Sequence, residues 1–152
     1  MKLKLIVIGQ KHPSWVQDGC EEYLKRFPAQ SKPQLIELPL PRRSKASDLA
    51  KLKAQEAESI LQQIGRQDHM VLLEITGKPF STPDLAKQLD QWMHLGQDLA
   101  LVIAGPDGAH ESLIVRANQL WSLSALTFPH PLAKLIVCEQ LYRAFSILHH
   151  HP

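Results

Sequence analysis

Cysteine is scarce in this sequence, which has only Cys20 and Cys138 among its 152 residues. The two cysteines lie far apart, form no Cys-X-X-Cys pattern, and each falls within a helical apolar pattern. This predicts buried thiols in a reduced, cytoplasmic protein. Zinc-type ligand spacings are also missing, and the terminal run His149 to His151 does not by itself make a shaped ligand set, so no metal is expected.

Long hydrophobic runs are missing as well. The apolar start "MKLKLIVIGQ" is too short to span a membrane, and it lacks the regions and cleavage site of a signal peptide. It is typical of a buried strand instead, and no membrane partner is expected. Because the sequence shows no repeat, no low-complexity tract and no linker, residues 1–152 are predicted to form one domain.

Charge of one sign is in only slight excess. The formal net charge is +2, with 44% hydrophobic and 21% charged residues, which is typical of a globular protein. A mild basic excess permits a nucleic-acid partner without requiring one. Arg42, Arg43 and Lys45 form a basic, proline-flanked segment that could bind RNA phosphates, although a charged stretch is also typical of a solvated loop.

The order of apolar patterns predicts an α/β fold. Short apolar runs predict strands at 3–8, 34–38, 69–75, 99–103 and 120–123, and helical spacing predicts helices between them. A closing helix is expected at 132–148. This alternation implies a mostly parallel, doubly wound sheet in a single domain.

Three segments follow strands of this predicted sheet: "EITGKP", "AGPDG" and "SLSALTFPHP". Ligands of such sheets bind beyond the carboxyl ends of the strands, so the site is expected where these segments meet. Gly77 and Gly105 would let backbone approach a ligand closely, but a tight turn explains each glycine as well. "AGPDG" matches neither phosphate-binding glycine motif, so a phosphate cradle is not supported.

Two side chains near the end of the chain are candidates for chemistry. His130 lies between two prolines at the start of a helix, where the positive helix end favours a neutral imidazole. A capping or surface histidine is an equal alternative. Arg143 lies four residues after Glu139, and a plain ion pair on a solvated helix face is the alternative for it.

The stretch "WSLSALTFPHPLAKLIVCEQLYRAFSI", Trp121 to Ile147, closely resembles the C-terminal signature of SPOUT-class RNA methyltransferases. It resembles in particular the small ribosomal large-subunit methyltransferase H family. The segments "EEYLKRF", "LLEITGKPFSTPDLA" and "LVIAGPDG" fall in the order and spacing of that family, so the resemblance covers the whole chain. "LVIAGPDG", "TFPHPL" and "EQLYRA" are its most specific parts.

The resemblance implies that the C-terminal segment is threaded through a loop to form a deep trefoil knot, although knots are otherwise rare. Small residues at Ser122, Ser124 and Ala125 would let backbone pass backbone, and the prolines would delay the helix until the chain has cleared the knot. The resemblance also implies that the ligand is S-adenosylmethionine. Its adenine and ribose would be bound by apolar and small residues and by backbone groups. The residues expected to do so are Leu73, Gly77, Gly105, Leu123, Ser124, Ala125, Leu126, Thr127 and Phe128.

The reaction implied by the resemblance is methylation of N3 of a pseudouridine in helix 69 of 23S rRNA, within the ribosome. His130 is then the candidate base or a nearby hydrogen-bonding group. Arg143 would stabilise the developing imide anion or bind a phosphate. A homodimer through the knot region is also implied. The closing helix offers an apolar face for it, although this face could instead cover the helix's own sheet.

Three other functions remain open at this point: a SPOUT enzyme with another RNA target such as a ribose hydroxyl, a ribosome-binding module that holds the methyl donor without transfer, and an α/β nucleotide-binding protein. The missing phosphate motif argues against the last. One departure from the family pattern is the absence of a short tail containing Tyr-His-Arg after Pro152. This departure bears on activity and not on the family assignment.

Overall fold

The fold is built on a parallel sheet, seen in a computed structural model that describes residues 1–9, 12–42 and 48–150. Five strands pair in the order β2-β1-β4-β3-β5, and every neighbouring pair is parallel. This confirms the predicted α/β class and single domain. The strands are β1 (Leu3–Ile8), β2 (Gln34–Leu38), β3 (His69–Pro79), β4 (Leu99–Ile103) and β5 (Gln119–Ser122).

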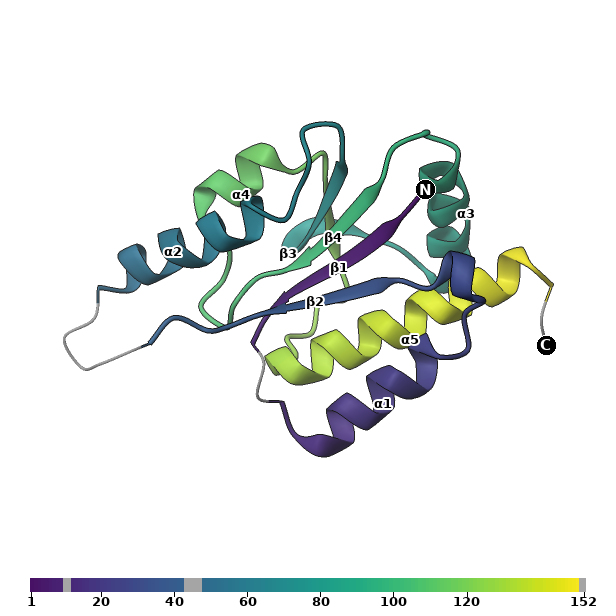
Figure 1. Cartoon of the computed structure of the whole chain (residues 1–152), viewed down its shortest axis with the longest axis horizontal. Coiled ribbons are helices and arrows are strands. Elements are labelled where there is room, and N and C mark those ends of the chain that lie inside the picture. The colour runs from purple at the N-terminus through teal and green to yellow at the C-terminus, as the bar shows by residue number, and fades with distance from the viewer. Residues whose placement is uncertain (10–11, 43–47, 151–152) are drawn as a thin grey trace.

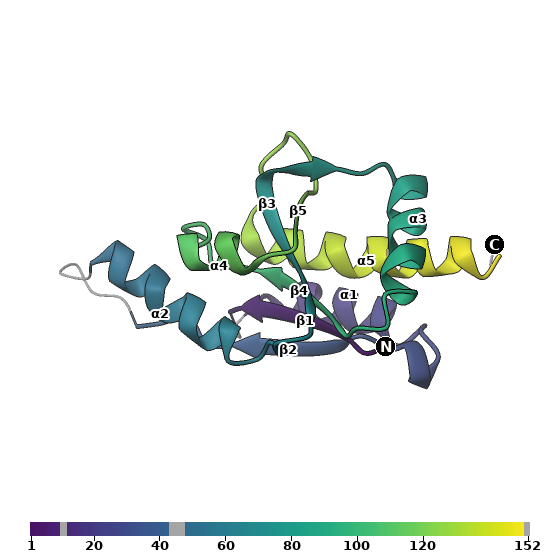
Figure 2. The same ribbon diagram turned by 90° about the horizontal axis from the view of Figure 1, so that it is seen from above.

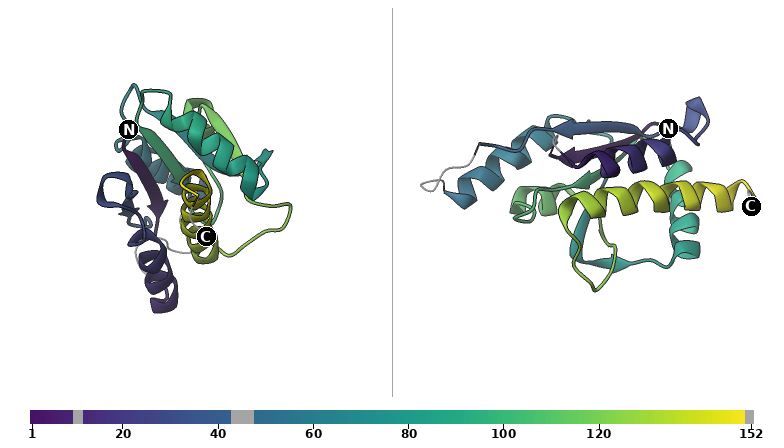
Figure 3. Two further views of the ribbon diagram at one scale, coloured as in Figure 1. Left: turned by 90° about the vertical axis from the view of Figure 1, so that its right-hand side faces the viewer. Right: turned by 90° about the horizontal axis from the view of Figure 1, so that it is seen from below.

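Helices cover both faces of this sheet (Figure 1). The helices are α1 (Ser14–Leu24), α2 (Leu49–Leu61), α3 (Thr82–Met93), α4 (Glu111–Arg116) and α5 (His130–Leu148), with a 3-10 turn, η1, at Ala29–Ser31. Helices α1, α3 and α5 share one apolar cluster with the sheet, and α2 and α4 share the other. Figure 3 shows α1 and α5 running side by side on the same face. The predicted doubly wound arrangement is therefore confirmed.

The central strands read as continuous apolar runs because both of their faces are covered. In β1, Leu5 and Val7 pack in the cluster with α1 and α5, whereas Ile6 and Ile8 pack in the cluster with α2. All four side chains are fully buried. Cys20 and Cys138 are both buried free thiols in the α1–α5 layer, as predicted.

Strand β3 is longer than predicted. The sequence "TGKP" predicts a turn, but β3 continues to Pro79, because Lys78 and Pro79 pair with Trp121 and Ser122 of β5. Pairing with a distant strand has overridden a local turn signal. Proline is tolerated here because it stands at the end of a strand.

Helix α5 begins earlier than predicted, at His130 instead of Leu132. Pro131 lies within its first turn, where a missing N–H costs nothing because these amides have no partner inside the helix. The apolar face predicted for α5 packs on its own protomer: Cys138, Leu141 and Phe145 are buried in the core. The outward side instead carries Arg143 and Ile147, both exposed.

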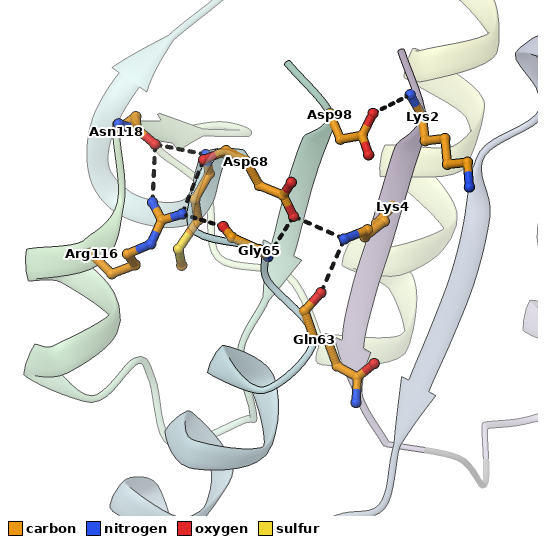
Figure 4. Close-up of polar contacts among 9 residues, drawn as sticks. Lys2, Lys4, Gln63, Gly65, Asp68, Asp98, Arg116 and Asn118 are labelled. Atoms are coloured by element: carbon orange, nitrogen blue, oxygen red, sulfur yellow. Dashed lines mark hydrogen bonds and ion pairs between the residues drawn. The ribbon is translucent and has the colours of Figure 1, made fainter.

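An ion pair ties the amino ends of the strands together (Figure 4). Lys4 of β1 lies 2.8 Å from Asp68, which directly precedes β3, and Lys4 also donates to the Gln63 carbonyl. The same Asp68 carboxylate accepts from the backbone N–H of Gly65 at 2.7 Å. Arg116, at the end of α4, donates to the Gly65 and Asp68 carbonyls.

This surrounding sets the charge state of Asp68. Burial by itself would raise the pKa of Asp68, but the hydrogen bonds from Lys4 and Gly65 and the positive charges of Lys4 and Arg116 outweigh it and lower the pKa. The carboxylate is therefore ionised at neutral pH, and the amino edge of the sheet is held by a satisfied ion pair.

Candidate functional site

The site begins with an irregularity in β3. Leu73 pairs with Trp121 of β5, and five residues later Lys78 pairs with the same Trp121. The residues between them leave the ladder, which makes a large bulge in β3. Figure 2 shows this bend and the loop after β5 projecting together from one side of the molecule, at the top of the view.

Gly77 permits the return of β3 to β5. A Cβ at this position would lie 2.5 Å from the backbone carbon of Leu120 and 2.6 Å from the backbone nitrogen of Trp121. No real side chain tolerates such contacts with backbone, so only glycine fits. The sequence singled out Gly77 for a ligand, whereas the structure gives it backbone-to-backbone packing.

A pocket of about 210 Å³ lies between the bulge and the loop after β5. It opens at the carboxyl ends of β3 and β5, which is the edge where parallel α/β sheets bind ligands. Most of its exposed lining is apolar, with a few polar side chains among it. The lining residues are Leu73, Glu74, Ile75, Ser122, Leu123, Ser124, Leu126, Thr127, Phe128 and Ala133.

The loop that forms one wall is held by short-range hydrogen bonds. The Ser122 hydroxyl donates to the Ser124 carbonyl at 3.1 Å, and the Leu126 N–H donates to the Ser124 hydroxyl at 3.0 Å. On the opposite wall, Glu74 accepts from the N–H and hydroxyl of Thr76. Leu126 is 70% exposed, so an apolar side chain is held at the pocket mouth without a covering partner in this protomer.

Six of the nine residues predicted to bind the methyl donor line this pocket: Leu73, Leu123, Ser124, Leu126, Thr127 and Phe128. Ala125 lies in the same loop without lining the pocket. Sequence reasoning missed Glu74, Ile75, Ser122 and Ala133. Three of these lie inside segments that the sequence placed at the site edge, but Ala133 lies within α5 and needed the folded structure.

Gly105 is not part of the pocket lining either. It is buried, and a Cβ there would lie 2.5 Å from a carboxylate oxygen of Glu56, a buried residue of α2. Of the three segments expected to meet, "EITGKP" and "SLSALTFPHP" form the pocket, and "AGPDG" does not line it, since Gly105 packs against Glu56 of α2.

His130 stands at the start of α5, outside the pocket lining. Its Nε2–H donates to the carbonyl of Ile8, at the end of β1, with 2.5 Å between nitrogen and oxygen. Burial lowers the pKa of His130, the Ile8 hydrogen bond opposes this, and the charge of Lys134 lowers the pKa further. A neutral ring with its proton on Nε2 leaves Nδ1 as an acceptor.

His12 lies beside this ring. The two ring centroids are 5.8 Å apart in an edge-on arrangement. Burial lowers the pKa of His12 as well, and the charges of Lys134 and His130 add to the effect. The carboxyl end of β1 therefore carries two imidazoles that favour the neutral form, next to a buried lysine.

Arg143 is exposed on the outward face of α5 and donates two hydrogen bonds to Glu139, at 2.6 and 2.8 Å. This is the i,i+4 ion pair that the sequence offered as an alternative. Arg143 lies thirteen residues after His130 in the same helix, which corresponds to roughly 20 Å along the axis. The two side chains of one protomer therefore cannot contact one reacting atom.

Arg42 follows β2, at the opposite side of the sheet from the pocket. Arg42 is exposed there. Arg43 and Lys45 lie outside the described residues. Among the described residues, no group of three His, Cys, Asp or Glu side chains is arranged to hold a metal ion. No helix in the described ranges is long and apolar enough to cross a membrane.

A larger cavity, of about 440 Å³, opens at the amino edge of the sheet between η1, α3 and α5. Leu3, Phe27, Leu89 and Phe145 are among its lining residues. None of the residues predicted to bind the donor lines it, and it lies at the wrong ends of the strands for a ligand of a parallel sheet. We therefore place the candidate site in the smaller pocket.

Comparisons with known proteins match the whole chain. The family described as "Predicted SPOUT methyltransferase" matches residues 1–152. The chain is 54% identical over 152 residues to Ribosomal RNA large subunit methyltransferase H of Hahella chejuensis, covering 100% of this chain and 97% of that protein. It is 44% identical over 152 residues to the protein of the same name from Saccharophagus degradans, of which it covers 98%.

Replacing Gly77 by alanine tests the close approach of β3 to β5. The added Cβ would meet backbone that cannot rotate away, so Gly77→Ala should lower the free energy of unfolding by about 2 kcal/mol. Gly96→Ala is the control, because a Cβ there meets nothing within 4 Å and only its positive φ of +73° is strained. Chemical denaturation would measure both. A Gly77 variant no less stable than the Gly96 variant would contradict the tight crossing.

The lowered pKa of His130 predicts a pH-dependent stability. Because the unfolded histidine titrates near 6.5 and the folded one below that, the unfolded chain takes up the proton first as pH falls. Stability should be full above pH 6.5 and decline as pH falls through the folded pKa. Thermal unfolding between pH 8 and pH 5 should show a flatter pH dependence in His130→Gln, and flatter still with His12→Gln added. A wild-type slope in the double variant would refute the assignment.

Proposed function

The chain belongs to the SPOUT methyltransferase family, and on this premise we propose that it transfers a methyl group from S-adenosylmethionine to N3 of a pseudouridine in helix 69 of 23S rRNA within the ribosome. The observation that carries the proposal is the pocket at the carboxyl edge. It is formed by two of the three segments that the sequence assigned to the donor, the bulge of β3 and the loop after β5. Action in the cytoplasm, where ribosomes are, is part of the proposal.

The relatives support the choice of substrate. Both are named as methyltransferases of ribosomal RNA of the large subunit, and each is matched along nearly its whole length. The net charge of +2 is compatible with an RNA partner. Arg42 is exposed after β2, and with Arg43 and Lys45 it is proposed to bind phosphates of the RNA backbone.

The pocket fits part of the donor. Its volume of about 210 Å³ is below the 300–1,000 Å³ of pockets that enclose a whole ligand, so it suits the adenine and ribose end. Leu73, Leu123 and Phe128 supply apolar walls, and backbone groups of the loop can pair with the adenine edge. Gly77, Gly105 and Ala125 are proposed to act on the donor indirectly, by shaping the backbone around it.

S-adenosylmethionine supplies an activated methyl group on a positively charged sulfur. The protein's main contribution is to hold the methyl group in line with the attacking nitrogen, since orientation can supply about 7–11 kcal/mol of the barrier. N3 of pseudouridine is an imide nitrogen and becomes nucleophilic when it loses its proton. A positioned base adds roughly 10²- to 10⁴-fold. His130, with its neutral ring, is the proposed base or a nearby hydrogen-bonding group.

Arg143 is proposed to stabilise the imide anion or to bind a phosphate. Since it lies roughly 20 Å from His130 along α5, both residues serve one reaction only if they come from different protomers. We therefore propose a homodimer whose contact includes the outward face of α5 and the loop after β5. Leu126 at the pocket mouth and Ile147 on α5 are 70% and 42% exposed and would be covered in it.

Methyl transfer to defined ribosomes tests the function. Labelled S-adenosylmethionine would be added to ribosomes whose helix 69 carries either pseudouridine or uridine. Transfer should occur mainly to the pseudouridine ribosomes and give 3-methylpseudouridine in the nucleoside digest. A methylated ribose in the digest would instead indicate another RNA target. Donor binding without transfer would indicate a binding module. Stabilisation by ATP or NAD, but not by S-adenosylmethionine, would overturn the proposed donor.

Mixing two inactive variants tests the shared site. If each site takes His130 from one protomer and Arg143 from the other, His130→Ala and Arg143→Ala subunits should complement each other after exchange. One of the two sites in each mixed dimer is then intact, so about a quarter of wild-type activity should return. The control is exchange of each variant with itself, which should restore nothing. Failure of the mixture to recover activity, with subunit exchange verified by mass, would refute the shared site.

A further inference from the structure

A second ion pair lies at the carboxyl edge of the sheet, on the far side from the pocket. Lys134, near the start of α5, lies 3.0 Å from the Glu37 carboxylate of β2. The lysine side chain is 1% exposed and the glutamate side chain 29% exposed. The pair therefore joins the start of the last helix to the edge strand through the protein interior.

Burying the Lys134 side chain at this position is energetically unfavourable. A buried cation loses its hydration, and the positive end of α5 adds repulsion. Replacing a buried ion pair by apolar side chains of similar size is often neutral or stabilising for a fold. Packing in the α1–α5 layer therefore does not require a lysine. We look for the role of Lys134 in the positions of the residues around the ion pair.

The pair lies about one helical turn beyond the end of the pocket loop. The loop leaves β5 after Ser122, which is held by pairing with Pro79, and it ends at His130, which is held by the Ile8 carbonyl. Between these points, two short-range hydrogen bonds through Ser124 are the side-chain hydrogen bonds of the loop among the described residues. Its shape thus depends on where its two ends are held.

The pair also adjoins a wall of the pocket. Ala133 lines the pocket, and Lys134 is the next residue in the same turn of α5. Any rotation of this turn would move Ala133 and the end of the loop together. The Glu37 carboxylate restrains that rotation, because a hydrogen-bonded ion pair inside a protein has one favourable geometry.

We propose that Lys134 and Glu37 form a positioning pair that sets the shape of the loop at 123–129 and thereby the affinity for the methyl donor. The inference rests on the proposed function, since it takes the pocket as the donor site. Neither residue touches the donor. They act through the first turns of α5, and the His130–Ile8 hydrogen bond holds the same end of the loop.

The matched control is the ion pair at the amino edge. Lys4 and Asp68 are also joined across the sheet, at 2.8 Å, and lie far from the pocket. Glu37→Gln and Asp68→Asn each replace an ion-paired carboxylate by an amide of the same shape. Lys134→Met and Lys4→Met each remove a paired ammonium group. The variants at both ion pairs should be less stable than the wild type. Only the variants of Glu37 and Lys134 should change donor binding.

The experiment is calorimetric titration of each full-length variant with S-adenosylmethionine, together with steady-state kinetics. Glu37→Gln and Lys134→Met should weaken binding by about tenfold. The apparent KM for the donor should rise while kcat at saturating donor stays close to wild type. Lys134→Arg should bind the donor more tightly than Lys134→Met, because it keeps the positive charge. The double variant should be no weaker than either single variant, because the two residues act as one unit.

Hydrogen exchange of the unliganded chain gives a readout without donor. The Leu126 amide and its neighbours in the loop should exchange faster in Glu37→Gln than in Asp68→Asn. Glu37 is partly exposed, so this variant remains informative even if Lys134→Met does not fold.

Three outcomes overturn the inference. The first is wild-type donor affinity in Glu37→Gln, together with unchanged loop exchange. The second is an equal loss of affinity in Asp68→Asn, which would indicate general destabilisation. The third is absence of donor binding by the wild-type chain, which would overturn the proposed function and the inference with it.

Discussion

The backbone contact between β3 and β5 at Gly77 is the constraint on which the rest of the site depends. Since Leu73 and Lys78 both pair with Trp121, the residues between them must leave the sheet. They become one wall of the pocket, and the chain after Ser122 must turn away beside them and becomes the other. A trefoil knot, which the family resemblance predicts, would need such a contact without intervening side chains. The knot itself stays a prediction.

The amino and carboxyl edges of the sheet each carry a lysine–carboxylate ion pair, but the two pairs have different roles. At the amino edge, Lys4 and Asp68 join β1 to the start of β3. The Gly65 N–H also donates to the Asp68 carboxylate, and Arg116 donates to the Asp68 carbonyl. At the carboxyl edge, Lys134 is more deeply buried and lies in a helix whose first turns border the pocket. An ion pair at the first edge stabilises the fold, and one at the second edge also orients a loop.

The length of α5 has a consequence for function. The helix carries His130 at its start and Arg143 past its middle. The two candidate catalytic residues are therefore separated along the helix and do not lie together at one site. Its apolar face is buried against the sheet, and its outward face carries Arg143, Glu139 and Ile147. The proposed homodimer would have to bring His130 of one copy close to Arg143 of the other.

The sequence by itself determined the strand and helix order, because the apolar runs of β1, β2 and β4 are continuous and the helices repeat at their own period. It also identified six pocket residues, because their segment resembles a family signature. It could not give the extension of β3 to Pro79, since "TGKP" is locally a turn and only pairing with β5 makes it a strand. Nor could it place Ala133 in the pocket or bury Lys134 against Glu37, residues 97 apart in the chain. Those contacts depend on which distant segments the fold brings together, and a charged residue in a helical pattern is read as exposed until its partner strand is in place.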